Sequence, residues 1–187
     1  MQAAERLLED AAARLNDLPP DSGARLIYSI RRSKLALKRD DPRAARDAIQ
    51  PTIDLFEARG MRGAILAIAL ELRSESEHRL GNESNALRDA EMSLAITQRI
   101  QGSRPHSLLT GQSWLQLARL KREGDVAGSR EAAQNTVAHL SDMLGDEHRD
   151  TQSARKLAAR QGAVHRACCA ACRPPRSLLS SFSSRLR

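Results

Sequence analysis

Four side chains that could bind a metal ion or exchange protons lie close together in the segment LGDEHRDTQSARKLA, residues 144–158. They are Asp146, Glu147, His148 and Asp150. A tetrahedral metal site needs ligands that converge from different directions, and five consecutive positions do not present four ligands to one ion. Asp146 and Asp150 are suited instead to capping a helix N-terminus, where carboxylates accept hydrogen bonds from free backbone N–H groups. We therefore interpret the segment as a joint between two helical units.

A second group of potential metal ligands lies near the C-terminus, where all three cysteines of the chain occur. His165 could add a fourth ligand to Cys168, Cys169 and Cys172. Zinc ribbons use two pairs of ligands at a defined separation, and this segment has only one Cys-x-x-Cys pair. A crowded zinc cluster is one hypothesis, and a disordered basic tail over residues 162–187 is the other.

The tail also accounts for most of the net charge of +7. Residues 162–187 hold five arginines and no acid, whereas residues 1–161 hold 25 basic and 23 acidic side chains. A nearly neutral body with few aromatics argues against a nucleic-acid-binding protein. Because the tail is rich in Arg, Ser, Pro and Cys, as in out-of-frame translation of GC-rich DNA, we hypothesise a frameshifted gene or a piece of a longer protein.

Sequence patterns typical of enzymes or membrane proteins are not found. The chain contains no Gly-rich phosphate loop, no HExxH pair and no Gly-x-Ser-x-Gly turn. Its longest apolar run, AILAIAL at residues 64–70, is far shorter than the roughly 20 residues that span a bilayer. The charged, amphipathic N-terminus does not resemble a secretory signal. We therefore expect a cytoplasmic protein that is not an enzyme, with no cofactor, no metal and no membrane span.

Turn residues recur along the chain with a fixed period, which indicates repeated structural units. One series, with intervals of 41 and 43 residues, consists of Asp41, Asn82 and Asp125. A second series, with intervals of 42 and 43 residues, consists of Gly60, Gly102 and Gly145. A glycine can take the left-handed backbone conformation that ends a helix. Each unit of about 42 residues is therefore predicted to be two helices joined by a short turn.

Matching positions after the first series of turns carry small or apolar residues at steps of four. Four positions after the turn residues lie Ala45, Ala86 and Ser129. Eight positions after them lie Ile49, Ala90 and Ala133, and twelve positions after them lie Ile53, Leu94 and Val137. Steps of four place residues on one face of a helix, so this face is predicted to be buried. Helices are predicted over residues 3–17, 22–39, 43–59, 62–80, 83–101, 107–123, 126–143 and 150–161.

These elements predict an all-α fold, and more specifically an α-solenoid of antiparallel helix hairpins. A single hairpin cannot bury both of its faces, so neighbouring hairpins stack and leave a concave inner surface. We expect one repeat domain over residues 1–161, followed by the tail. Its parts are hairpins at about 21–59, 60–102 and 103–144, and a terminal helix at 145–161.

The segment 114–158 resembles the tetratricopeptide repeat in its 42-residue form, as in kinesin light chains and many bacterial signalling proteins. In that form a Gly-x-x-His-Pro-x-Thr linker joins two repeats and is followed by Leu-Ala. The residues that match are Gly145, His148, Thr151, Leu157 and Ala158, with Arg149 at the usual proline position. The resemblance implies a superhelical scaffold for protein–protein interaction, a module also attached to bacterial serine/threonine kinases.

We therefore expect a scaffold that binds a partner peptide or domain in its concave groove. Basic or polar residues recur in the first helix of each pair, in the series Lys38, Arg79 and Arg122 and the series Arg32, Arg73 and Gln116. These residues could grip an acidic peptide, or the first series could stabilise the negative ends of helices. The candidate partner-binding residues are Gln112, Gln116, Arg119 and Arg122.

Two other functions remain as alternatives. One is a ligand- or peptide-sensing module of a transcriptional regulator or kinase. The other is a basic-tail anchor for nucleic acid or an anionic membrane, which predicts that deletion of residues 162–187 abolishes binding. Since an uncapped array exposes an apolar helix face, a homodimer through the terminal helices is a further expectation.

Overall fold

The computed structural model describes residues 2–15 and 17–159, which form helices and connecting turns without any strand. The all-α class is therefore confirmed. Seven helices have the bounds α1 (Gln2–Leu15), α2 (Gly23–Lys38), α3 (Pro42–Ala58), α4 (Ala64–Arg79), α5 (Glu83–Gln101), α6 (Leu108–Leu120) and α7 (Val126–Leu144). Residues 149–159 form a further helical segment. The tail and its cysteines lie outside the described residues.

Short polar side chains determine where several helices begin. The Asp41 and Asp125 carboxylates each accept a backbone N–H at 2.9 Å, from Ala44 and Gly128 respectively. These bonds satisfy donors that the first turn of a helix leaves free. The predicted helix boundaries are mostly correct to within two residues. The main difference is the end of α6 at Leu120, since the N–H of the later residue Arg122 bonds three residues back rather than four.

The three glycines predicted to end helices all have a positive φ angle. The values are 60° at Gly60, 60° at Gly102 and 84° at Gly145. Side chains with a Cβ rarely adopt this region, so glycine is favoured where the chain must turn out of a helix. The prediction for these positions is confirmed.

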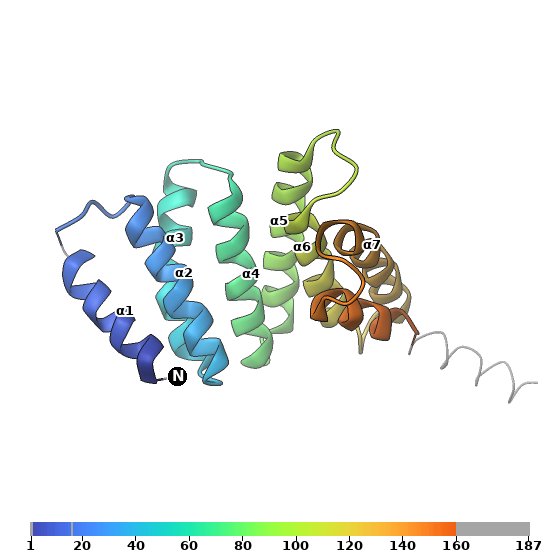
Figure 1. Cartoon of the computed structure of the whole chain (residues 1–187), viewed down its shortest axis with the longest axis horizontal. Helices are drawn as coiled ribbons and strands as arrows, with labels where there is room; N and C mark the ends of the chain where they lie inside the picture. The colour runs from blue at the N-terminus through green and yellow to red at the C-terminus, as the bar shows by residue number, and fades with distance from the viewer. Residues whose placement is uncertain (1, 16, 160–187) are drawn as a thin grey trace, which may run out of the picture.

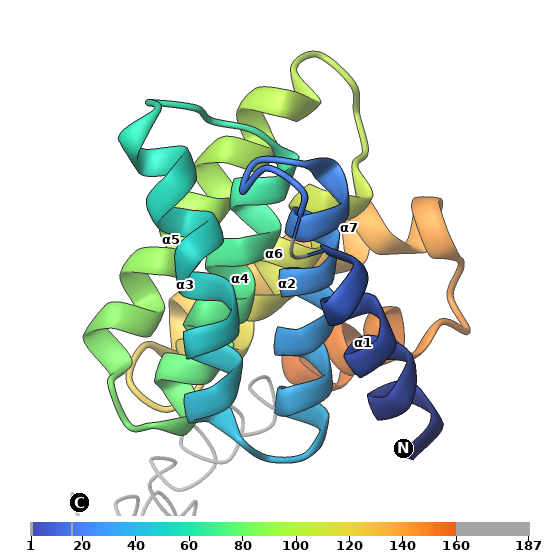
Figure 2. The same cartoon turned by 90° about the vertical axis from the view of Figure 1, so that its left-hand side faces the viewer.

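The helices lie in a row in which each packs against its neighbours in the chain (Figure 1). In Figure 1 the turns after α2 and α4 lie along the lower edge of the row, and those after α3 and α5 along the upper edge. Alternate helices also meet, because α2 contacts α4 and α4 contacts α6. Among the described helices, α3, α5 and α7 make no such contacts with one another. Figure 2 accordingly shows α3 and α5 on one side of the row and α2 on the other.

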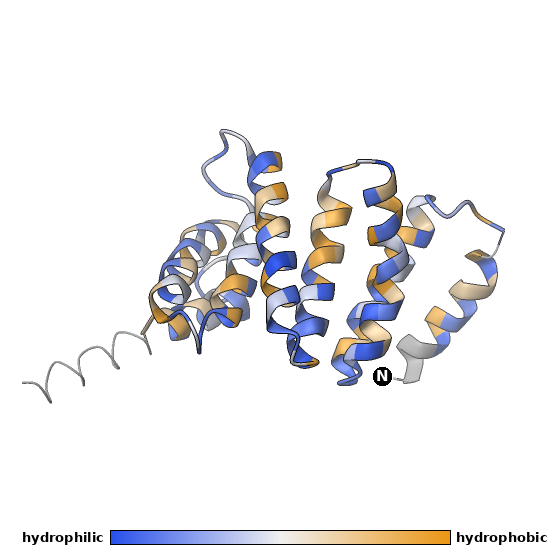
Figure 3. Ribbon diagram, turned by 180° about the vertical axis from the view of Figure 1, so that it is seen from behind, coloured by the Kyte–Doolittle hydropathy of each residue, from blue (hydrophilic) through white to orange (hydrophobic). Residues whose placement is uncertain are grey.

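Helix α4 forms the centre of the hydrophobic core. Its N-terminal half is almost entirely apolar, as Figure 3 shows, and includes the fully buried Leu66 and Leu70. A helix that contacts neighbours on several sides needs apolar residues around most of its circumference. The AILAIAL run is thus explained by contacts of α4 with α2, α3, α5 and α6. Within the described ranges, no helix combines the length and apolar character that crossing a bilayer requires.

The periodic face predicted from the turns is buried at eight of its nine positions, and only Val137 is half-buried. Small residues on this face allow neighbouring helices to approach closely. At two of these contacts a buried serine hydroxyl donates to a carbonyl of the partner helix, from Ser74 to Ala86 at 2.8 Å and from Ser129 to Ala118 at 2.6 Å. The periodic positions therefore bring α4 against α5 and α6 against α7.

Candidate partner-binding cleft

The acidic segment before the last helical segment forms an ordinary helix start. The Nδ1 atom of His148 accepts a hydrogen bond from the Asp150 N–H at 3.2 Å, so the histidine makes the side-chain cap. Asp146 instead pairs with Arg155 at 2.5 Å, and this hydrogen bond holds the pKa of Asp146 below its usual range. The predicted capping by Asp146 is therefore corrected, while the charge of Asp150 lies in the first turn, where a carboxylate is favourable. In the described part of the chain, no three His, Cys, Asp or Glu side chains are grouped so that they could hold a metal ion.

A cleft of about 360 Å³ lies where α4, the end of α6 and the helical segment 149–159 meet. Its polar lining consists of Glu75, His78, Arg119, Arg122, Ser153 and Lys156. Each of the three segments contributes two polar residues spaced by three positions, and Arg122 lies just beyond the end of α6. The cleft therefore lies on the side of the row where alternate helices approach one another.

The cleft carries an excess of positive charge. Arg119 and Lys156 are exposed and have no hydrogen-bond or ion-pair partner among the described residues. Arg122 pairs with Glu123 at 2.8 Å, and both side chains are more than half exposed. Exposed pairs of this kind contribute little free energy, so Arg122 can exchange Glu123 for another anion.

The acidic side of the cleft is already engaged. Glu75 accepts a hydrogen bond from Arg79 at 2.8 Å and another from the Gln116 amide at 3.2 Å. The ring of His78 lies 2.8 Å from the carboxylate of Glu83. The groups left available to a partner are therefore the cations of α6 and of the segment 149–159.

The structure brings together two of the four predicted partner-binding residues, Arg119 and Arg122. Gln116 is only 7% exposed, and its amide joins α6 to α4 through Ser74 and Glu75. Gln112 is half-buried and does not line the cleft. Binding of a partner by these four residues stays a prediction.

Sequence reasoning missed four polar residues of the lining, Glu75, His78, Ser153 and Lys156. They lie on α4 and on the segment 149–159, and the two residues on each are spaced by three positions, as Arg119 and Arg122 are. This shared spacing is the signal that could have found them. It was not recognised because the residue types differ from one of the three segments to the next.

The predicted series of cations does not form one continuous surface. Arg79 donates to the Leu37 carbonyl at the end of α2 at 2.8 Å and pairs with Asp40 at 3.3 Å. The charge of Arg79 therefore lies at the negative C-terminal end of α2. At this position the structure favours stabilisation of a helix end over the binding of a partner. Arg73 is engaged by Asp89, and of the six positions in the two series only Arg122 lines the cleft.

Comparison of the chain with protein-family models, curated proteins and solved structures finds no match. The resemblance to tetratricopeptide repeats therefore rests on the periodic residues and on the segment 114–158.

Proposed function

We propose that the chain is a cytoplasmic helical-repeat scaffold of the tetratricopeptide type that binds a partner peptide in a groove. In this proposal α2–α3, α4–α5 and α6–α7 are stacked hairpins of a solenoid. The contacts of α2 with α4 and of α4 with α6 support it, because α3, α5 and α7, within the described helices, have no equivalent contacts. A row whose first helices lie closer together than its second helices curves toward the first helices, which makes their side concave.

The observation that carries the proposal is the convergence of Arg119, Arg122 and Lys156 on one cleft. Arg119 and Lys156 have no partner among the described residues, and Arg122 has only its exposed pair with Glu123, so the three cations repel one another and a bound anion would reduce that repulsion. Arginine also binds carboxylates through two parallel hydrogen bonds. The preferred partner is therefore a peptide with acidic side chains that crosses from α4 to the segment 149–159.

Selection from a displayed peptide library on the wild-type chain tests this function, followed by affinity measurements on the selected peptides. The groove variant is Arg119→Glu/Arg122→Glu. The matched control is Arg43→Glu/Arg130→Glu, which changes two exposed arginines on α3 and α7 and gives the same net charge. We expect the control to bind like wild type and the groove variant to bind at least about tenfold more weakly, since charge-assisted hydrogen bonds are lost.

Thermal denaturation followed by circular dichroism checks that both variants remain folded. Equal affinity of the two variants would contradict the groove assignment. Failure of the wild-type chain to enrich any peptide would contradict the scaffold function itself.

A second candidate function is the sensing of a small ligand by a regulatory protein, favoured by a separate cavity between α1, α2 and α3.

The predicted homodimer also stays a proposal. Leu7 on α1 is 70% exposed and offers an apolar contact for a second copy. Light scattering on the purified chain distinguishes that dimer from a monomer.

A further inference from the structure

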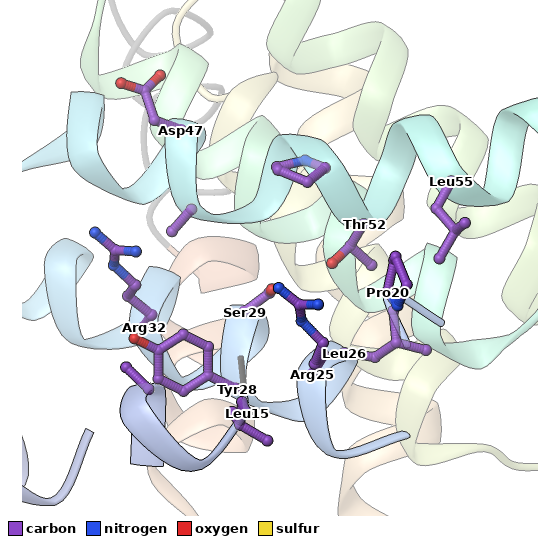
Figure 4. Close-up of a pocket in the computed structure, with 13 residues that line it drawn as sticks. Leu15, Pro20, Arg25, Leu26, Tyr28, Ser29, Arg32, Asp47, Thr52 and Leu55 are labelled. Carbon is purple, nitrogen blue, oxygen red and sulfur yellow. The ribbon is translucent and has the colours of Figure 1, made fainter. Parts of the chain in front are cut away.

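A cavity of about 360 Å³ lies between α1, α2 and α3, in a different part of the row from the cationic cleft (Figure 4). Its apolar wall is formed by Ala12, Leu15, Leu26, Ala48, Pro51 and Leu55. The volume falls at the lower end of the range of small-molecule pockets, which are mostly apolar with a few convergent polar groups. The cavity is thus large enough for a small organic molecule.

Three hydroxyl groups line this cavity without being used by the protein. Tyr28 and Ser29 come from α2, and Thr52 comes from α3 on the opposite wall (Figure 4). None of the three hydroxyls has a hydrogen-bond partner in the described part of the chain. Thr52 is 3% exposed as a residue, and Tyr28 and Ser29 are half-buried. Hydroxyl groups that line a cavity without an internal partner can each donate or accept a hydrogen bond to a ligand bound there.

Two arginines on α2 give the cavity a positive charge. Arg25 donates one hydrogen bond from Nη1 to the Leu18 carbonyl at 2.8 Å, and this contact holds the guanidinium beside the cavity. Arg32 lines the cavity and has no partner among the described residues. The acid in the lining, Asp47, is 70% exposed and pairs with Arg46 at 3.2 Å. The cationic donors facing the cavity are therefore available to an anion.

We propose that this cavity binds a small carboxylate with an apolar body, either a short aliphatic chain or a single aromatic ring. Arg32 and the hydroxyls would bind the carboxylate, since guanidinium geometry matches its two oxygens. The apolar body would lie against Leu15, Leu26 and Leu55. This site is independent of the peptide groove, because no residue lines both.

Titration calorimetry on the full chain tests the proposal with octanoate and benzoate as probes. The matched neutral probes are 1-octanol and benzyl alcohol, which have the same apolar bodies without the charge. We expect one-to-one binding of at least one acid, with its alcohol at least about tenfold weaker because the charge-assisted hydrogen bonds are missing. The tighter of the two acids identifies the body as aliphatic or aromatic.

Variants locate the binding site. Arg32→Gln should weaken binding of the acid about tenfold, whereas Arg31→Gln, an exposed neighbour outside the cavity, should leave it unchanged. Ala48→Leu should fill the cavity and block binding in a chain whose circular dichroism spectrum is unaltered. Equal affinity for acid and alcohol, equal affinity of the Arg31 and Arg32 variants, or no binding of either acid would overturn the proposal. Peptide binding in the cleft should survive Arg32→Gln, so failure at one site does not count against the other.

Discussion

The guanidinium of Arg73 on α4 donates hydrogen bonds to both carboxylate oxygens of Asp89 on α5, at 2.6 Å and 2.9 Å. It also donates to the amide oxygen of Gln50 on α3 at 3.1 Å, so that one side chain joins three consecutive helices. The Asp89 side chain is 1% exposed and that of Arg73 13%, so both charges are largely removed from water. Within the row, Arg73 therefore acts as a cross-link between helices.

Replacing only one member of this pair should destabilise the fold strongly. Arg73→Met leaves the buried Asp89 carboxylate with only the exposed Arg88 at 3.9 Å, and we expect the free energy of unfolding to fall by about 3–5 kcal/mol. The double variant Arg73→Met/Asp89→Leu should recover most of that loss, since an apolar pair of similar volume carries no desolvation cost. Urea denaturation of both single variants and the double variant measures the coupling between the two positions.

The exposed pair of Arg122 and Glu123 provides a control, because truncation there should change stability by less than about 1 kcal/mol. Single-variant losses below that size at Arg73 or Asp89 would show that the pair does not stabilise the fold. A double variant as unstable as the sum of both single changes would show that the two side chains act separately.

Close contact between α6 and α7 makes Gly111 a sensitive position. A Cβ atom there would lie 2.5 Å from Leu140 Cδ2 and 2.9 Å from His139 Cβ. We expect Gly111→Ala to lower the free energy of unfolding by about 1–3 kcal/mol through overpacking, although alanine has the higher helix propensity. Chemical denaturation followed by circular dichroism measures the change. The control is Gly23→Ala on α2, where no atom lies within 4 Å of the new Cβ and stability should be nearly unchanged. A stabilised Gly111 variant would mean that α6 and α7 can move apart at little cost.

The helices could be predicted from the sequence because their start and stop signals are local. Asp41 accepts an N–H from the residue three positions later, and Gly60 turns the chain by its own backbone conformation. Neither effect depends on distant parts of the chain. The same locality explains why the buried face counted from the turns is correct.

The roles of Arg73 and Gln116 could not be predicted in this way. The period of the sequence gives the two residues equivalent positions, one on α4 and one on α6. Each side chain, however, bonds to a residue whose type does not recur at the corresponding positions along the chain. Arg73 bonds to Asp89, and Gln116 bonds to Glu75. Arg119 lies near the end of α6 and Arg122 just beyond it, and both side chains are exposed.

The carboxylate of Glu71 on α4 lies in a network of hydroxyl groups. Ser113 on α6 donates to it at 2.5 Å, and Ser93 on α5 donates at 3.2 Å. Burial raises the pKa of Glu71 to about 7, although the hydrogen bonds from Ser113 and Ser93 and the charge of Lys34 act in the opposite direction. The folded chain therefore binds this proton more tightly than the unfolded chain, in which the pKa is 4.5.

The pH dependence of stability follows from that difference. Between pH 4.5 and about 7 the folded state holds more protons at Glu71, so the free energy of unfolding falls as the pH rises through this range. Glu71→Gln removes the charge of this half-buried side chain and keeps an oxygen that can accept the hydrogen bond from the Ser113 hydroxyl. We expect this variant to be more stable than wild type by roughly 1–3 kcal/mol at pH 8 and nearly equal to it at pH 4.5. Urea denaturation at the two pH values measures the difference, with the exposed Glu131→Gln on α7 as a control that should show no such change. If Glu71→Gln and wild type differ by the same amount at both pH values, ionisation of Glu71 does not limit the stability of the α4–α6 contact.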